Sequence, residues 1–139
     1  MLKLKPFEQK PGYCGPASLK AVLSYFGVEK GEMSLVRLSK CSKDKGVEAE
    51  NLLRAAKKLG FKGFIKDYSD FKDVKKFLKK KIPVIVDWFS VDEGHYSVIV
   101  GINDKKIFFM FFLQRGLAQT SSLFFFFALG SLRGKLFLS

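Results

Sequence analysis

Apolar residues recur at intervals of three and four along the first half of the chain, which is the spacing of helices with one buried face. Gly27 and Gly60 each follow such a segment, at the position where glycine commonly ends a helix. Ser69 can cap a further helix, in which lysines face water opposite an apolar stripe. We predict helices over residues 15–26, 34–41, 47–59 and 69–79.

The second half of the chain contains short apolar runs bounded by turn residues, a pattern typical of strands. We predict strands over residues 61–65, 82–86, 96–102 and 107–113. Residues 103–106 can form the turn between the last two strands. Helices that precede an antiparallel sheet indicate an α+β fold, and 139 residues fit one domain with its own core.

The net charge of +12 is unusual for a chain in which 47% of the residues are hydrophobic. Such a charge suits an anionic partner, either nucleic acid or an acidic membrane surface. The basic residues, however, are spread through the helical segments and do not form one tract with interleaved aromatic residues. We therefore favour a solvated, lysine-rich surface and expect no nucleic-acid partner, with nucleic-acid or membrane binding as the alternative.

Cysteine content and the N-terminal sequence both bear on the compartment. Cys14 and Cys41 are too few for a disulfide scaffold, and residues 1–12 lack the apolar core of a secretory signal. No apolar run reaches the roughly 18 residues that a spanning helix needs. One histidine and two distant cysteines fall short of a metal ligand set. We expect a reduced, cytoplasmic protein that needs no metal and no cofactor.

The candidate chemistry lies at Cys14, which opens the first predicted helix, with Pro16 in the first turn. A helix N-terminus and a nearby imidazolium both stabilise a thiolate, and His95 is the single histidine. Gln9 carries an amide that can donate to an oxyanion beside the Cys14 backbone N–H. The competing interpretation is that an isolated cysteine or histidine is structural; Cys41, which does not open a helix, is interpreted as structural or exposed.

Several sequence blocks strengthen the first interpretation. They are Gln9 with Cys-Gly-Pro-Ala-Ser-Leu at 14–19, Gly-Val at 46–47, Asn-Leu-Leu at 51–53, Leu-Gly at 59–60, Ile-Pro-Val-Ile-Val at 82–86 and His-Tyr-Ser-Val-Ile-Val-Gly at 95–101. Their order and spacing over about residues 5–110 resemble the bacteriocin-processing, double-glycine leader peptidases.

The resemblance implies a papain-like cysteine peptidase fold with Cys14 as nucleophile, His95 as base and Gln9 in the oxyanion hole. It also implies cleavage of a leader peptide after a Gly-Gly pair. In that family the domain usually belongs to an ATP-driven peptide exporter at the inner face of the membrane. The chain has no phosphate-binding loop and no spanning segment, so it is either a free-standing member with a separately encoded exporter as its partner, or a fragment.

The chain departs from the family pattern after His95. The family has an Asp-Pro pair about sixteen residues after the histidine, and this Asp orients the imidazole. Phe111 stands at that position here. Asp104 lies in a predicted turn, a strand length of about 20–30 Å from His95. Gln114 is expected nearly opposite His95 in the last hairpin, where its amide can orient the imidazole instead.

The composition changes at the same place. No Asp or Glu follows Asp104, and nine of the sixteen phenylalanines lie between 108 and 137. We therefore divide the chain into a peptidase-type domain, 1–110, and a Phe-rich tail, 111–139. A frameshift near codon 111 would explain both changes, and such a tail would not complete the sheet. The missing Asp leaves one alternative function, a catalytically impaired domain that binds leader peptides.

Overall fold

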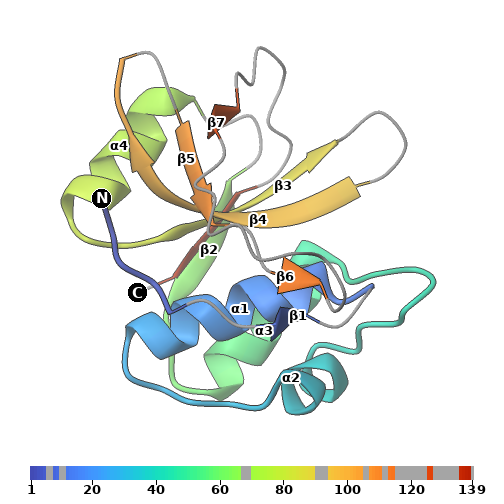
Figure 1. Ribbon diagram of the computed structural model, residues 1–139. Coiled ribbons are helices and arrows are strands. Elements are labelled where there is room, and N and C mark those ends of the chain that lie inside the picture. The colour runs from blue at the N-terminus through green and yellow to red at the C-terminus, as the bar shows by residue number, and fades with distance from the viewer. Residues whose placement is uncertain are drawn as a thin grey trace.

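The computed structural model describes residues 1–5, 8–9, 12–66, 70–89, 94–104, 107–110, 113–114, 125–126 and 135–138. Within these residues, four helices lie in the first part of the chain and most strands follow them, in the α+β arrangement that the hydrophobic pattern predicted (Figure 1). The helices are α1 (Cys14–Tyr25), α2 (Glu32–Leu38), α3 (Ala49–Lys58) and α4 (Phe71–Lys79). The strands are β1 (Glu8–Gln9), β2 (Gly63–Lys66), β3 (Val84–Phe89), β4 (Gly94–Ile102), β5 (Ile107–Met110), β6 (Leu113–Gln114), β7 (Phe125–Phe126) and β8 (Lys135–Leu138).

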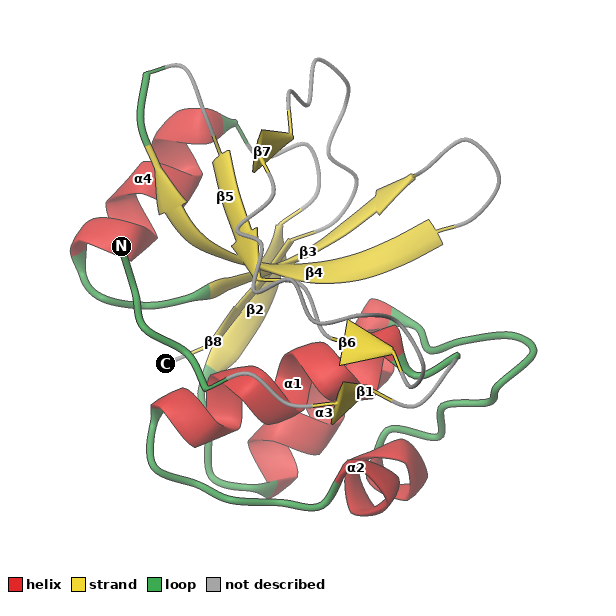
Figure 2. Cartoon of the chain, in the orientation of Figure 1, coloured by secondary structure: helices red, strands yellow, loops and turns green. Residues whose placement is uncertain are grey.

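An antiparallel sheet of six strands, in the order β2-β8-β3-β4-β5-β7, forms the centre of the molecule. Helices α1, α2 and α3 lie on one side of this sheet and α4 lies on the other (Figure 2). The two remaining strands, β1 and β6, pair in parallel as a separate two-stranded sheet. The long β3–β4 ladder joins the sheet's middle strands and fixes the start of β4, where His95 pairs with Trp88.

The C-terminal part of the chain contributes to this sheet. Strand β8 lies between β2 and β3 and pairs with both, and β7 pairs with the edge of β5. The expectation that a tail after residue 110 would not complete the sheet is therefore wrong. The apolar sequence Leu-Phe-Leu at 136–138 suits a strand enclosed by two neighbours. The domain boundary after residue 110 and the frameshift remain predictions.

Alternation along β4 supplies two cores, because successive side chains of a strand point to opposite faces. Tyr96, Val98 and Val100 are buried against the α1–α3 layer. Ile99 is buried on the other face in the cluster that contains Val74 of α4. The strand that begins beside His95 is thus packed on both sides, which makes it a rigid support for the site.

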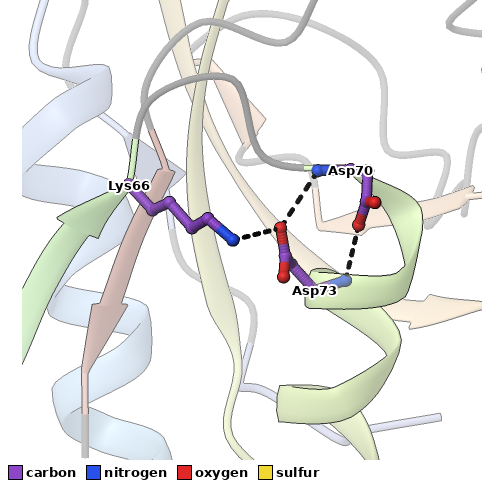
Figure 3. Close-up of polar contacts among 3 residues, drawn as sticks. All are labelled: Lys66, Asp70 and Asp73. Atoms are coloured by element: carbon purple, nitrogen blue, oxygen red, sulfur yellow. Dashed lines mark hydrogen bonds and ion pairs between the residues drawn. The ribbon is translucent and has the colours of Figure 1, made fainter.

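Helix α4 begins with a capping box at Asp70, one residue after the predicted cap. The Asp70 carboxylate accepts a hydrogen bond from the Asp73 N–H (2.9 Å), and the Asp73 carboxylate accepts one from the Asp70 N–H (3.2 Å). Asp73 is also paired with Lys66 of β2 at 2.8 Å (Figure 3). Ser69 lies outside the described residues, and the prediction that it caps α4 is wrong.

We predict that Asp70→Ala lowers the free energy of unfolding by about 1 kcal/mol, because the backbone N–H of Asp73 loses the carboxylate that caps it. Asp70→Asn is the matched control, since its side-chain oxygen still accepts the bond from Asp73. Urea denaturation followed by circular dichroism measures both. Equal stabilities for Asp70→Ala and the wild type would show that the box contributes nothing.

Candidate active site

Cys14 is the first residue of α1, as the sequence predicted. Gly15 and Pro16 in the first turn are buried, whereas the Cys14 side chain is partly exposed. The Ser18 hydroxyl donates a hydrogen bond to the Cys14 carbonyl at 2.8 Å and so ties the first two turns of the helix together. The sulfur is therefore held at the end of a helix that is anchored in the core.

The turn at Gly15 leaves no room for a side chain. A Cβ at this position would collide with Val47 Cγ1 and would lie 3.4 Å from Tyr96 Cδ2 and 3.5 Å from Leu52 Cδ1. Three parts of the chain thus meet at one backbone position: α1, the segment before α3, and β4. The glycine of the Cys-Gly-Pro block permits this close approach.

Tyr96 fastens the same junction. Its hydroxyl donates a hydrogen bond to the Val47 carbonyl at 2.8 Å, and the side chain is only 8% exposed. Burial, the largest cause, raises the pKa of the phenol, so the hydroxyl keeps its proton and remains a donor. The bond joins the start of β4 to the segment that packs on Gly15.

Burial raises the pKa of the Cys14 thiol above its ordinary value. The backbone N–H groups of Tyr96 and Gly15 act in the opposite direction, and the Asp87 carboxylate reinforces the rise. The expectation that the helix N-terminus and a nearby imidazolium together stabilise a Cys14 thiolate stays a prediction. Desolvation of the charged sulfur outweighs the donors around it, so the resting group is a thiol that needs a base.

His95 is the second residue of β4, and the next residue, Tyr96, packs on Gly15, the residue after Cys14. The backbone N–H of Tyr96 is one of the groups that lower the pKa of the Cys14 thiol. The fold thus brings together two residues about eighty positions apart in the chain. The imidazole itself is outside the described part of the structure.

Gln9 is in β1, five residues before Cys14, and its strand partner is Gln114 of β6. The prediction that Gln114 lies opposite His95 is wrong, because β6 leaves the β4–β5 ladder and joins β1 instead. A bulge at Val100 also shifts the β4–β5 register between Ile99 and Gly101. Sequence spacing alone cannot count the extra residue that such a bulge inserts.

Asp104 follows β4 at the end away from His95, as its position in a predicted turn required. Its carboxylate is 2.9 Å from the Lys75 ammonium, and the hydrogen bond and charge of Lys75 lower the pKa of that carboxyl. The Asp104 carboxylate thus pairs with a lysine of α4, at the end of β4 away from His95. Phe111, which stands at the position of the expected triad Asp, lies outside the described residues.

The sequence profile of the Peptidase C39 family matches residues 7–121. The chain belongs to the Peptidase C39 family. Its cysteine-peptidase character at the level of the family follows from this membership. No curated protein matches the chain at significant similarity.

Solved structures show the same C39 peptidase fold. The peptidase domain of Streptococcus ComA, a bi-functional ABC transporter involved in a quorum-sensing pathway, has a TM-score of 0.72 and 21% identity, covering 100% of this chain and 98% of that one. A double-glycine-motif protease from an AMS/PCAT transporter, in complex with the leader peptide, has a TM-score of 0.68 and 24% identity. The match covers 99% of this chain and 91% of that one. The ComA peptidase domain of Streptococcus mutans has a TM-score of 0.63 and 21% identity, and the match covers 97% of this chain and 98% of that one.

Three features of this C39 site have no assigned role in the sequence reasoning. Tyr96 was part of a matched block, but only its contacts show that it joins β4 to Val47. Asp87 lies opposite Tyr96 in β3 and acts electrostatically on Cys14. Cys41 is a free, partly exposed thiol whose pKa is raised by burial and by the charge of Cys14, so it lies in the same neighbourhood. Long-range contacts of this kind leave no local sequence signal.

The described residues contain neither a candidate metal site nor a helix that could span a membrane. Within the described ranges, no group of three or more His, Cys, Asp or Glu side chains is arranged to hold a metal ion. Among the helices of those ranges, none is long and apolar enough to cross a membrane.

We predict that Gly15→Ala destabilises the protein by about 1–3 kcal/mol, because the new Cβ must displace Val47 in a packed junction. Adding Val47→Ala should recover at least about 1 kcal/mol of that loss. Urea denaturation of the wild type, both single variants and the double variant measures this coupling. Strictly additive effects would mean that Val47 does not set the requirement for glycine.

We also predict that alkylation of Cys14 by iodoacetamide accelerates with pH, with a midpoint above the value of about 8.5 for a free cysteine. The sign follows from burial, which disfavours the thiolate and so raises the pKa. The measurement uses Cys41→Ser, in which Cys14 is the single thiol, with the urea-unfolded chain as the control. A midpoint below about 7 would instead reveal a thiolate–imidazolium pair.

Proposed function

We propose that this chain is a cysteine endopeptidase that cleaves leader peptides after a Gly-Gly pair, with Cys14 as nucleophile and His95 as its base. One observation supports the proposal: in a member of the C39 family, the residue after His95 packs on the residue after Cys14, since a Cβ on Gly15 would lie 3.4 Å from Tyr96 Cδ2. A buried thiol with a raised pKa is inert unless a base removes its proton. The backbone position of His95 suits that task.

The reaction then proceeds in two halves. The His95 imidazole takes the thiol proton as Cys14 Sγ attacks the carbonyl carbon of the second glycine, and the negative charge passes to the carbonyl oxygen. Gln9 and the Cys14 N–H donate hydrogen bonds to this oxyanion. The imidazolium protonates the departing amine, and water, deprotonated by the imidazole, hydrolyses the thioester and releases the leader.

Similar structures support a proposal for the substrate and the partner. One similar structure is a double-glycine-motif protease with its leader peptide, and two are peptidase domains of ComA. We propose a Gly-Gly leader peptide as substrate and a separately encoded ATP-driven peptide exporter as partner. We place the protein in the cytoplasm, at the inner face of the membrane when it is bound to that exporter.

The alternative function is a catalytically impaired domain that binds leader peptides without cleaving them. The observation in its favour is Phe111 at the position of the family Asp, since an imidazole without its orienting acid is a weaker base. The described structure supplies no substitute at Asp104, whose carboxylate is paired with Lys75. Cleavage and binding have to be measured separately to distinguish the two functions.

We predict that the wild-type chain cleaves a synthetic leader peptide after its Gly-Gly pair, as identified by mass spectrometry. Cys14→Ala and His95→Ala should each lower kcat/KM by about a thousandfold or more, because each removes a partner of the same step. A peptide with Ala-Ala in place of Gly-Gly is the substrate control. Cleavage that survives Cys14→Ala would rule out the proposed nucleophile.

A pair of variants at Phe111 separates the two functions. Phe111→Asp should raise kcat/KM by about tenfold or more, whereas Phe111→Asn, which lacks the charge, should raise it far less. If the wild type binds the peptide and cleaves none of it, but Phe111→Asp restores cleavage, the binding function is correct. A chain that neither binds nor cleaves leader peptides would contradict both.

A further inference from the structure

The exposed side of α4 consists of lysine. The buried and half-buried positions of this helix hold Val74, Phe77 and Leu78, whose side chains pack toward the sheet. The opposite side and the residue after it form the α4 lysine face, which consists of Lys72, Lys75, Lys76, Lys79 and Lys80. These five side chains border one shallow hollow whose lining contains no other residue.

This arrangement costs the helix stability. Lysines at positions three and four apart lie next to each other on a helix and repel, as Lys72 and Lys76 or Lys76 and Lys80 do. Lys72 also lies in the first turn, where the helix dipole disfavours a cation. The α4 lysine face is therefore poorly explained as a device that stabilises its own helix, and a polyanionic partner would turn the same repulsion into attraction.

Few carboxylates offset this charge within the described residues. Asp104 pairs with Lys75 but is itself 94% exposed, so the pair lies in water and is weak. The Asp73 carboxylate pairs with Lys66 and accepts a hydrogen bond from the backbone N–H of Asp70. The Asp70 carboxylate accepts a hydrogen bond from the backbone N–H of Asp73. The α4 lysine face thus keeps a strong positive potential.

An exposed aromatic residue lies at the edge of this charge. Phe71, the first residue of α4, is 48% exposed and stands one helical turn before Lys75 on the flank of the lysine face. Lysines beside an exposed phenylalanine form the combination with which surface helices bind lipid headgroups and insert apolar groups between them. α4 also lies across the sheet from α1, so a partner bound there leaves Cys14 open (Figure 2).

We propose that the α4 lysine face binds the surface of an anionic lipid bilayer directly, with Phe71 among the headgroups. Lysine is a compact, strongly hydrated point charge that suits the diffuse field of such a surface. The face has no Arg, Asn or Gln, which make many of the bidentate contacts to base edges, and the exposed Phe71 at its margin suits an apolar environment between lipid headgroups. This contact needs neither an exporter nor peptidase activity.

Sedimentation of the full chain with vesicles tests the proposal. Vesicles of phosphatidylcholine with about 30% phosphatidylserine should bind the wild type, and pure phosphatidylcholine vesicles should not. Removing a lysine near such a surface weakens binding roughly fivefold, so the α4 variant should lose about a hundredfold or more. The α4 variant carries Lys→Gln at 72, 76, 79 and 80, which retains the Lys75–Asp104 pair and helix propensity.

The matched control removes four exposed lysines from the other side of the sheet, at 30, 40, 45 and 57, and should lose less than about tenfold. Phe71→Ser should weaken binding by about tenfold with no change in charge. Circular dichroism verifies that each variant is folded. Equal losses in the two lysine variants, no binding to anionic vesicles, or tighter α4-dependent binding to duplex DNA than to vesicles would each overturn the proposal.

Discussion

The rest of the site depends on the close approach of β4 and residue 47 to the backbone of Gly15. Because Gly15 has no side chain, Tyr96 and Val47 can pack directly on the first turn of α1. The hydrogen bond from the Tyr96 hydroxyl to Val47 then holds the two contacts in one arrangement. The distance between Cys14 and the strand that carries His95 is set by packing at this point.

That packing has a chemical consequence. Close contact removes water from Cys14, and the cost of burying a charged sulfur exceeds what the surrounding N–H donors return. A helix N-terminus activates a thiol only where the sulfur is solvated enough for the donors to dominate. In this chain the same junction that packs on Gly15 also removes water from Cys14, and this burial raises the pKa of the thiol.

The sequence predicted those parts of the fold that depend on local spacing. The four helices follow from apolar residues at helical intervals, and the helix entry at Cys14 follows from Pro16 and from Gly27 at the other end. The errors arose where distant contacts decide. The apolar pattern does not reveal that β8 lies between β2 and β3. Residue spacing does not reveal the bulge at Val100, which shifts the pairing of β4 with β5 by one residue. Tyr96 was visible only as a neighbour of His95.

The two faces of the sheet divide the work of the molecule. On the α1 face, specific contacts at Gly15 and Tyr96 hold α1, β4 and residue 47 together. On the α4 face, a capping box at Asp70 secures a helix whose exposed side is uniformly basic. A helix with strong self-repulsion needs such an anchor, since the box and the pair with Lys66 hold its first turn while Val74 fixes it to the sheet. The structure thus supports a charged surface without loosening the strand on which the catalytic face depends.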